Sequence, residues 1–167
     1  MPCERLLFET KFCLPQSLAS CVVKLPRPLV FTNGCFDILH RGHVAYLSRA
    51  RALGASLVVA LNSDDSVRRL GKGADRPLNS LEDRMAVIAA LEGVDLVTWF
   101  EEDTPLDRII ESRPDVLVKG GDWAVDAIVG SAEVRAWGGS VHSIPFEFER
   151  STTAIVERIR NMHAYQG

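Results

Sequence analysis

Five short apolar runs, separated by segments of helical character, constrain the fold of this chain most. They lie within residues 28–32, 56–61, 95–100, 115–123 and 138–146. The runs are continuous rather than alternating, which is typical of strands that are buried on both faces of a parallel sheet. The sequence therefore predicts an α/β fold, a Rossmann-like, doubly wound parallel sheet of about five strands with helices on both faces.

The segments between these runs carry helix signals. Residues 43–53 place their apolar side chains on one helical face, and Gly54 ends that helix. Capping residues predict three further helix starts, at Asn79, Thr104 and Ser151. Residues 63–77 are polar and contain glycines, so we expect a loop there.

Length and composition indicate one globular domain. The chain has 167 residues, of which 47% are hydrophobic and 25% charged, and its net charge is −3. This balance excludes a general nucleic-acid or membrane surface. Residues 1–28 are expected to form an N-terminal extension, and residues 29–167 a single domain.

Targeting and redox signals are weak in this sequence. No apolar run approaches the roughly 20 residues of a membrane span, and no targeting segment stands out, so we expect a cytoplasmic protein. The four cysteines form no C-x-x-C pair, and we expect plain thiols; they are Cys3, Cys13, Cys21 and Cys35.

Polar motifs follow three of the predicted strands. His40 and His43 come after the first, residues 119–122 after the fourth, and residues 151–153 after the fifth. In a parallel sheet the carboxyl ends of the strands meet at one edge, where ligands bind. The sequence therefore predicts one binding site built from three distant segments.

The His40–Gly42–His43 arrangement suits a phosphate group. Side chains three apart on a helix share a face, and a glycine between them removes a side chain where a bulky group approaches. A helix N-terminus adds free N–H groups and a positive dipole end. The stretch is neither a G-x-G-x-x-G fingerprint nor a P-loop, and zinc pairs usually stand four apart around a glutamate. A simple capping or packing role for both histidines remains the alternative.

The stretch "GCFDILHRGH" at residues 34–43 resembles the nucleotidyltransferase superfamily, whose mark is G-x-F-D-x-x-H-x-G-H. The run at residues 151–153 and Arg84 resemble two further marks. Within the superfamily, "FTNGCFDILHRGH", Arg76-Pro77, "VKGGDW" and "STTAIVERI" are similar to the heptose 1-phosphate adenylyltransferases of bacterial surface-sugar pathways. The similarity covers roughly residues 29–160.

This resemblance implies transfer of AMP from ATP to heptose 1-phosphate, by in-line attack on the α-phosphate, with pyrophosphate leaving. It implies the nucleotidyltransferase fold, Mg²⁺ that arrives with ATP, and a homo-oligomer (a dimer or larger). Fewer than thirty residues precede the motif. We therefore expect the stand-alone form of the enzyme, served by a separate heptose kinase in the same lipopolysaccharide or surface-heptose pathway.

Residue roles follow from the motif and from side-chain chemistry. Three residues are expected to be catalytic: His40, His43 and Lys72. Contacts to the nucleotide are expected from Thr32, Asn33, Gly34, Cys35, Phe36, Gly42, Lys119, Gly120, Ser151, Thr152 and Thr153. Contacts to the sugar phosphate are expected from Asp37, Arg76, Arg84, Asp122 and Trp123.

Several of these roles have plainer alternatives. Lys72 is expected on a flap hinged at its neighbouring glycines. Arg84 either holds a phosphate through its planar fork or forms an ordinary salt bridge on the helix surface. Asp37 braces the loop, with placement of Mg²⁺ as the other option. Ser151 and Thr152 either bind phosphates or only cap a helix.

Three other functions remain open at this point. A glycerol-3-phosphate cytidylyltransferase-like enzyme using CTP shares the histidine motif, but that family carries Arg-Thr-Glu before Ser-Thr-Thr, whereas residues 146–150 read "FEFER". A non-catalytic nucleotide sensor is opposed by the intact motif residues. A class I aminoacyl-tRNA synthetase fragment is opposed by the short, acidic chain.

Overall fold

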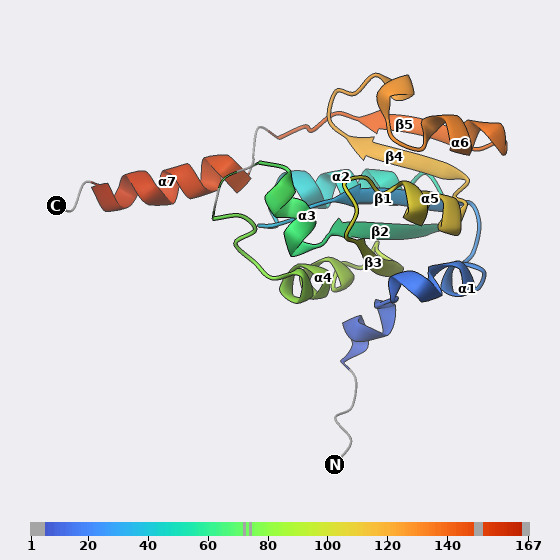
Figure 1. Ribbon diagram of the computed structural model, residues 1–167, viewed down its shortest axis with the longest axis horizontal. Coiled ribbons are helices and arrows are strands. Elements are labelled where there is room, and N and C mark those ends of the chain that lie inside the picture. Colours follow the sequence, from blue (N-terminus) through green and yellow to red (C-terminus); the bar gives the residue numbers. More distant parts are fainter. Residues whose placement is uncertain (1–5, 72, 74, 149–151, 165–167) are drawn as a thin grey trace, which may run out of the picture.

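A five-stranded parallel sheet forms the centre of the protein in a computed structural model that describes residues 6–71, 73, 75–148 and 152–164. The strand order is β3-β2-β1-β4-β5, and every pair of neighbours is parallel (Figure 1). The strands are β1 (Leu29–Gly34), β2 (Ser56–Asn62), β3 (Leu96–Phe100), β4 (Val116–Gly120) and β5 (Ser140–Ile144). Each falls within or beside a predicted run.

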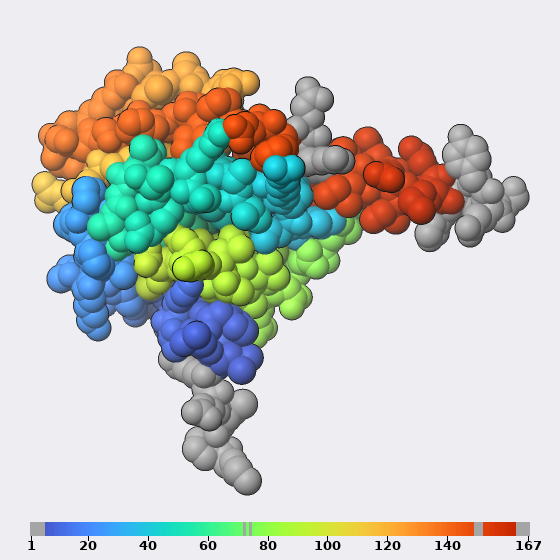
Figure 2. Space-filling model, turned by 180° about the vertical axis from the view of Figure 1, so that it is seen from behind, coloured from blue at the N-terminus to red at the C-terminus, as the bar shows by residue number. Residues whose placement is uncertain are grey.

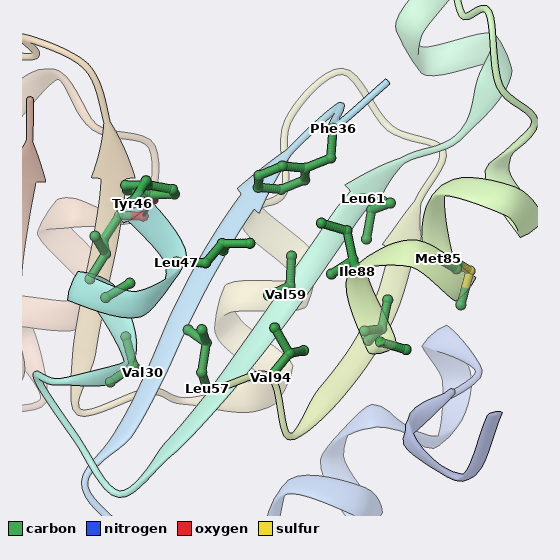
Figure 3. Packing of buried hydrophobic residues seen from close by; sticks show 14 of the residues in the cluster. Val30, Phe36, Tyr46, Leu47, Leu57, Val59, Leu61, Met85, Ile88 and Val94 are labelled. Atoms are coloured by element: carbon green, nitrogen blue, oxygen red, sulfur yellow. Dashed lines mark hydrogen bonds between the residues drawn. The ribbon is translucent and has the colours of Figure 1, made fainter. Parts of the chain in front are cut away.

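Helices cover both faces of this sheet, which confirms the doubly wound prediction. One face packs under α2 (Arg41–Arg51) and α4 (Leu81–Ala89), whose Leu47 and Ile88 join the cluster drawn in Figure 3. The other face packs under α1 (Leu18–Val22), α5 (Leu106–Ser112) and α6 (Ser131–Ala136). Alternate residues of β1 point to the two clusters, Val30 to the first and Phe31 to the second.

Three local predictions were wrong. Part of the expected loop is a helix, α3 (Asp64–Arg69), because the Ser63 hydroxyl caps it by accepting the Ser66 N–H. The cap of α4 is Ser80 rather than Asn79, whose own N–H donates to the Asp37 carboxylate instead. Helix α5 begins at Leu106, after Pro105 rather than Thr104 at the N-cap.

The segment before β1 is packed into the same body as the sheet. It contains η1 (Leu7–Lys11), η2 (Pro15–Ser17) and α1. The Cys13 N–H donates to the Val97 carbonyl of β3 at 2.9 Å, and Leu18 of α1 is fully buried in the second cluster. Within this segment, Cys13, Leu18 and Val22 are buried in the second cluster.

Two elements remain, η3 (Val125–Ala127) and α7 (Thr152–Ala164). Helix α7 projects from the body, as Figures 1 and 2 show from opposite sides. Its Ile159 and Met162 are 52% and 61% exposed. Within the described residues, no helix combines the length and the apolar character that a membrane crossing requires.

Candidate functional site

A cleft of about 560 Å³ opens at the carboxyl ends of β1 and β4. Strand β1 lies at the centre of the sheet, and β2 and β4 lie on its two sides, so the chain order reverses at this point. Ligands bind at such reversal points in open α/β sheets. The cleft is lined by Asn33, Gly34, Cys35, Phe36, Asp37, His40, His43, Tyr46, Arg76, Lys119, Gly120, Trp123, Phe146, Thr152 and Thr153.

The two motif histidines lie together at the start of α2. His40 is the N-cap residue with extended backbone, and His43 is in the first turn. Their rings stack with centroids 3.8 Å apart and planes 20° from parallel. Both rings line the cleft. The expectation that they point the same way is confirmed.

The His40 ring lines the cleft and lies beside Gly42 of α2. A Cβ on Gly42 would come within 3.0 Å of its Nδ1, so the glycine makes room for this ring. Gly42 itself does not line the cleft, and the space we expected for a ligand is taken by the imidazole. Burial lowers the pKa of His40 below its usual value, which favours the neutral ring at neutral pH.

Tyr46 anchors α2 to β1 and β4, a role that was not predicted from the sequence. Its buried hydroxyl donates to the Val118 carbonyl of β4 at 3.3 Å and shares a short hydrogen bond with the Thr32 hydroxyl of β1. The tyrosine lies one turn beyond His43, so the bond fixes the helix start above the sheet. Thr32 is fully buried in this contact and does not line the cleft.

Asp37 braces the loop that leads into α2. Its carboxylate accepts the N–H groups of Leu78 at 2.9 Å and Asn79 at 3.0 Å, and it pairs with Arg76 at 2.7 Å. Both side chains of the ion pair are at least 90% buried, yet both residues border the cleft. The bracing alternative fits these contacts, because the carboxylate oxygens are already committed.

Arg84 is not among the residues that line the cleft. Its fully buried guanidinium donates to the Cys35 carbonyl at 2.7 Å, to the Asn79 carbonyl at 3.2 Å, and to Asp64 at 2.7 Å. The ion pair with Asp64 is present, but Arg84 is fully buried rather than on the helix surface.

The far wall of the cleft comes from β4 and the segment after β5. The Lys119 ammonium donates to the Asn33 side chain at 3.3 Å. A Cβ on Gly120 would come within 2.7 Å of the Phe146 ring, so a larger residue there would displace that ring. Trp123 is 53% exposed, and its indole N–H donates to the Gly120 carbonyl. Asp122 is exposed and lies outside the lining.

A second lobe of about 370 Å³ adjoins the first. The two lobes share Asn33, Gly34, Cys35, Lys119 and Trp123. The second lobe adds polar side chains at the ends of β2 and β3, including Asn62, Asp103 and Thr104. None of these residues was predicted to lie in the site. Asn62 could have been, because it directly follows the predicted strand 56–61.

Four predicted site residues remain to be placed: Lys72, Ser151, Thr152 and Thr153. Lys72 and Ser151 lie outside the described residues. Thr152 and Thr153 line the cleft, and the Thr152 hydroxyl contacts the Ile38 carbonyl at 3.5 Å. Across the described part of the chain, no group of three or more His, Cys, Asp or Glu side chains is arranged to hold a metal ion.

Comparison with known proteins identifies relatives of this chain. The family described as cytidylyltransferase-like matches residues 31–164. A D-beta-D-heptose 1-phosphate adenylyltransferase from Bordetella bronchiseptica is 59% identical over 92% of this chain and 96% of its own length. A bifunctional protein HldE from Hahella chejuensis is also 59% identical, over 79% of this chain but only 28% of its own length.

A solved structure is similar as well. The lipopolysaccharide core biosynthesis protein from Thermoplasma volcanium superimposes with a TM-score of 0.60 at 30% sequence identity. The match covers 73% of this chain and 98% of that one. The described fold therefore recurs in a relative that matches over nearly its whole length.

Proposed function

Because this chain belongs to the cytidylyltransferase-like family and, within it, to the heptose 1-phosphate adenylyltransferases, we propose that it transfers AMP from ATP to heptose 1-phosphate. The products are ADP-heptose and pyrophosphate. One observation carries the proposal: two stacked imidazoles at the start of α2 border a cleft at the reversal point of the sheet. The identity to the Bordetella bronchiseptica adenylyltransferase supports the choice of substrates.

The proposed reaction depends on positioning the two phosphates rather than on a general base that removes a proton from the nucleophile. The second pKa of a phosphate monoester is near 6, so the attacking oxygen of the sugar phosphate is already mostly ionised at neutral pH. That oxygen forms a bond to the α-phosphorus, and the bond to the pyrophosphate oxygen breaks. Charge on the α-phosphate is stabilised by N–H groups of His40, His43 and the first turn of α2.

The two lobes suggest where the substrates lie. We assign the triphosphate to the lobe that contains the histidines, where Arg76 and Lys119 supply positive charge. We assign the sugar to the second lobe, because the amide of Asn62 and the hydroxyl of Thr104 suit sugar hydroxyls. Lys119 borders both lobes. In this assignment it lies near the triphosphate of ATP and near the phosphate of the sugar.

Magnesium is proposed to enter with ATP. The Asp37 carboxylate is committed to Arg76 and to two backbone N–H groups. This arrangement suits an ion that keeps its waters and binds the nucleotide phosphates. When bound, the ion neutralises phosphate charge, while the side chains of the protein orient the α-phosphate.

Pyrophosphate release tests the proposal directly. The purified protein is supplied with Mg²⁺ and either heptose 1-phosphate or glycerol 3-phosphate, each against ATP, CTP, GTP and UTP. We expect release with heptose 1-phosphate and ATP. Release with glycerol 3-phosphate and CTP would move the protein to the cytidylyltransferase activity, and nucleotide binding without any release would favour a sensor.

The supply of substrate and the location of the reaction are also proposals. A sugar 1-phosphate is made by phosphoryl transfer, so a heptose kinase in the same pathway is the proposed source. The nucleotide and sugar phosphate substrates suit the cytoplasm. The known relative whose name refers to lipopolysaccharide core biosynthesis supports a role in surface-sugar precursors.

We further propose that the protein is a homo-oligomer that uses α7. The helix projects from the body, and Ile159 and Met162 expose apolar surface on it. Light scattering of the purified protein should give a mass at least twice that of one chain. Replacement of Ile159 by glutamate should shift the mass toward 18.4 kDa, the mass of one chain. A single-chain mass for the unmodified protein would contradict this proposal.

A further inference from the structure

Phe36 adopts a backbone conformation that a bulky residue rarely tolerates. Its φ is +47°, in the left-handed region, while the residue is only 7% exposed. Among the described residues only Arg113 is another non-glycine with positive φ. Such a conformation persists where the surroundings hold it, and it gathers at functional sites.

The residues on both sides of Phe36, Cys35 and Asp37, are tethered. Before it, the Cys35 carbonyl accepts a hydrogen bond from the buried guanidinium of Arg84 at 2.7 Å. After it, the Asp37 carboxylate accepts two backbone N–H groups from residues 78 and 79, and the Asn79 side chain donates to the Asp37 carbonyl. Arg84 is itself fixed by Asp64. The turn is therefore held from α3, α4 and the segment between them.

The turn folds the Phe36 ring back over the end of β1, as Figure 3 shows. A Cβ on Gly34 would come within 2.9 Å of that ring, so the glycine permits the approach. The ring then meets His43 edge-on, with centroids 5.2 Å apart and planes 69° apart. His43 in turn stacks on His40. One continuous series of contacts links the buried Arg84 to both imidazoles.

We infer that Phe36 is a positioning residue for His43. The tethered left-handed turn aims the ring, and the ring limits the orientations that the His43 imidazole can adopt toward the reacting phosphate. Arg84 acts on the same imidazole through the Cys35 carbonyl. This inference rests on the proposed function, because it assigns the contact a role in that reaction.

Phe36→Leu tests the inference, with Phe31→Leu as the matched control. Both residues are buried phenylalanines of the same segment, but Phe31 faces the opposite cluster and lies away from the cleft. We expect Phe36→Leu to lower kcat at least tenfold with the KM for ATP within about threefold. Phe31→Leu should lower the melting temperature and leave kcat per folded molecule within about twofold.

A double-mutant cycle separates positioning from general stability. In a His43→Ala background, Phe36→Leu should lower kcat by less than about twofold, because the group that it positions is gone. An equal factor in both backgrounds would overturn the inference. Should Phe36→Leu fail to fold, Arg84→Lys takes its place in the cycle, since lysine keeps the charge but loses the fork.

An NMR measurement makes the inference independent of turnover. In the unliganded protein, the ring current of Phe36 should shift the His43 Hε1 resonance, and Phe36→Leu should remove that shift while Phe31→Leu leaves it in place. An unmoved resonance would overturn the inference even in an active enzyme. Failure of pyrophosphate release by the unmodified protein would instead count against the proposed function.

Discussion

At the scale of residues, the stacked imidazoles of α2 carry the chemistry in our proposal. Removing one well-placed hydrogen-bond donor costs on the order of 10²–10³ in rate. We expect that loss in kcat for His40→Ala and for His43→Ala, with circular dichroism spectra unchanged. Pyrophosphate release is the measurement. A double variant with full activity would exclude these residues from catalysis.

The pKa of His40 gives a prediction about stability. Burial lowers it in the folded protein, whereas in the unfolded chain it is about 6.5. As pH falls below about 6.5, the unfolded chain takes up the proton first, so the free energy of unfolding decreases. Urea unfolding at about pH 7 and about pH 5.5 should show a smaller decrease for His40→Gln than for the unmodified protein.

A matched control for this pH effect is His142→Gln, since His142 is exposed on β5. Comparison of the two substitutions separates the loss of the buried imidazole from a histidine-to-glutamine change as such. If His40→Gln and the unmodified protein lose the same free energy on acidification, another group is responsible for the dependence.

At the scale of elements, Gly42 lowers the intrinsic stability of α2 but leaves room for the His40 ring. Alanine is favoured over glycine inside a helix by about 1 kcal/mol. A Cβ at position 42, however, would stand 3.0 Å from the His40 ring and displace it. We expect Gly42→Ala to keep or raise the melting temperature and to lower kcat about tenfold.

Ser48→Ala on the exposed face of the same helix is the control for this substitution. It should change neither the melting temperature nor kcat appreciably. If Gly42→Ala keeps its kcat, the contact between the glycine and the His40 ring has no bearing on catalysis.

The elements also show what the sequence could predict. The strands were found because their apolar runs are continuous, and β1 matched within two residues. Helix α3 was missed because a serine cap and the buried Ser66 stabilise it, without an apolar stripe. In the cleft, the motif residues were expected, whereas Tyr46 and Phe146 reach it only through packing between distant segments.

At the scale of the whole molecule, the N-terminal segment is a structural part of the domain. Leu18 is fully buried against the second face of the sheet, whereas Leu14 is 52% exposed. Leu18→Ala should lower the free energy of unfolding by about 2–5 kcal/mol. Leu14→Ala, the control, should change it by less than about 0.5 kcal/mol.

Urea unfolding of both variants measures these changes, and kcat per folded molecule should be unaffected because the segment is remote from the cleft. Equal stability of the two variants would mean that the N-terminal segment adds little to the core.

The contact of this segment with β3 has a consequence for solubility. An uncovered edge strand offers a row of unpaired backbone groups to any other chain, and this is a common route to aggregation. Phe12 bridges to Val97, and the Cys13 N–H occupies the Val97 carbonyl, so the β3 edge is partly covered. The opposite edge, β5, instead carries the exposed polar residues Ser140 and His142. Loosening the N-terminal segment should therefore cause precipitation at temperatures where the cleft is still intact.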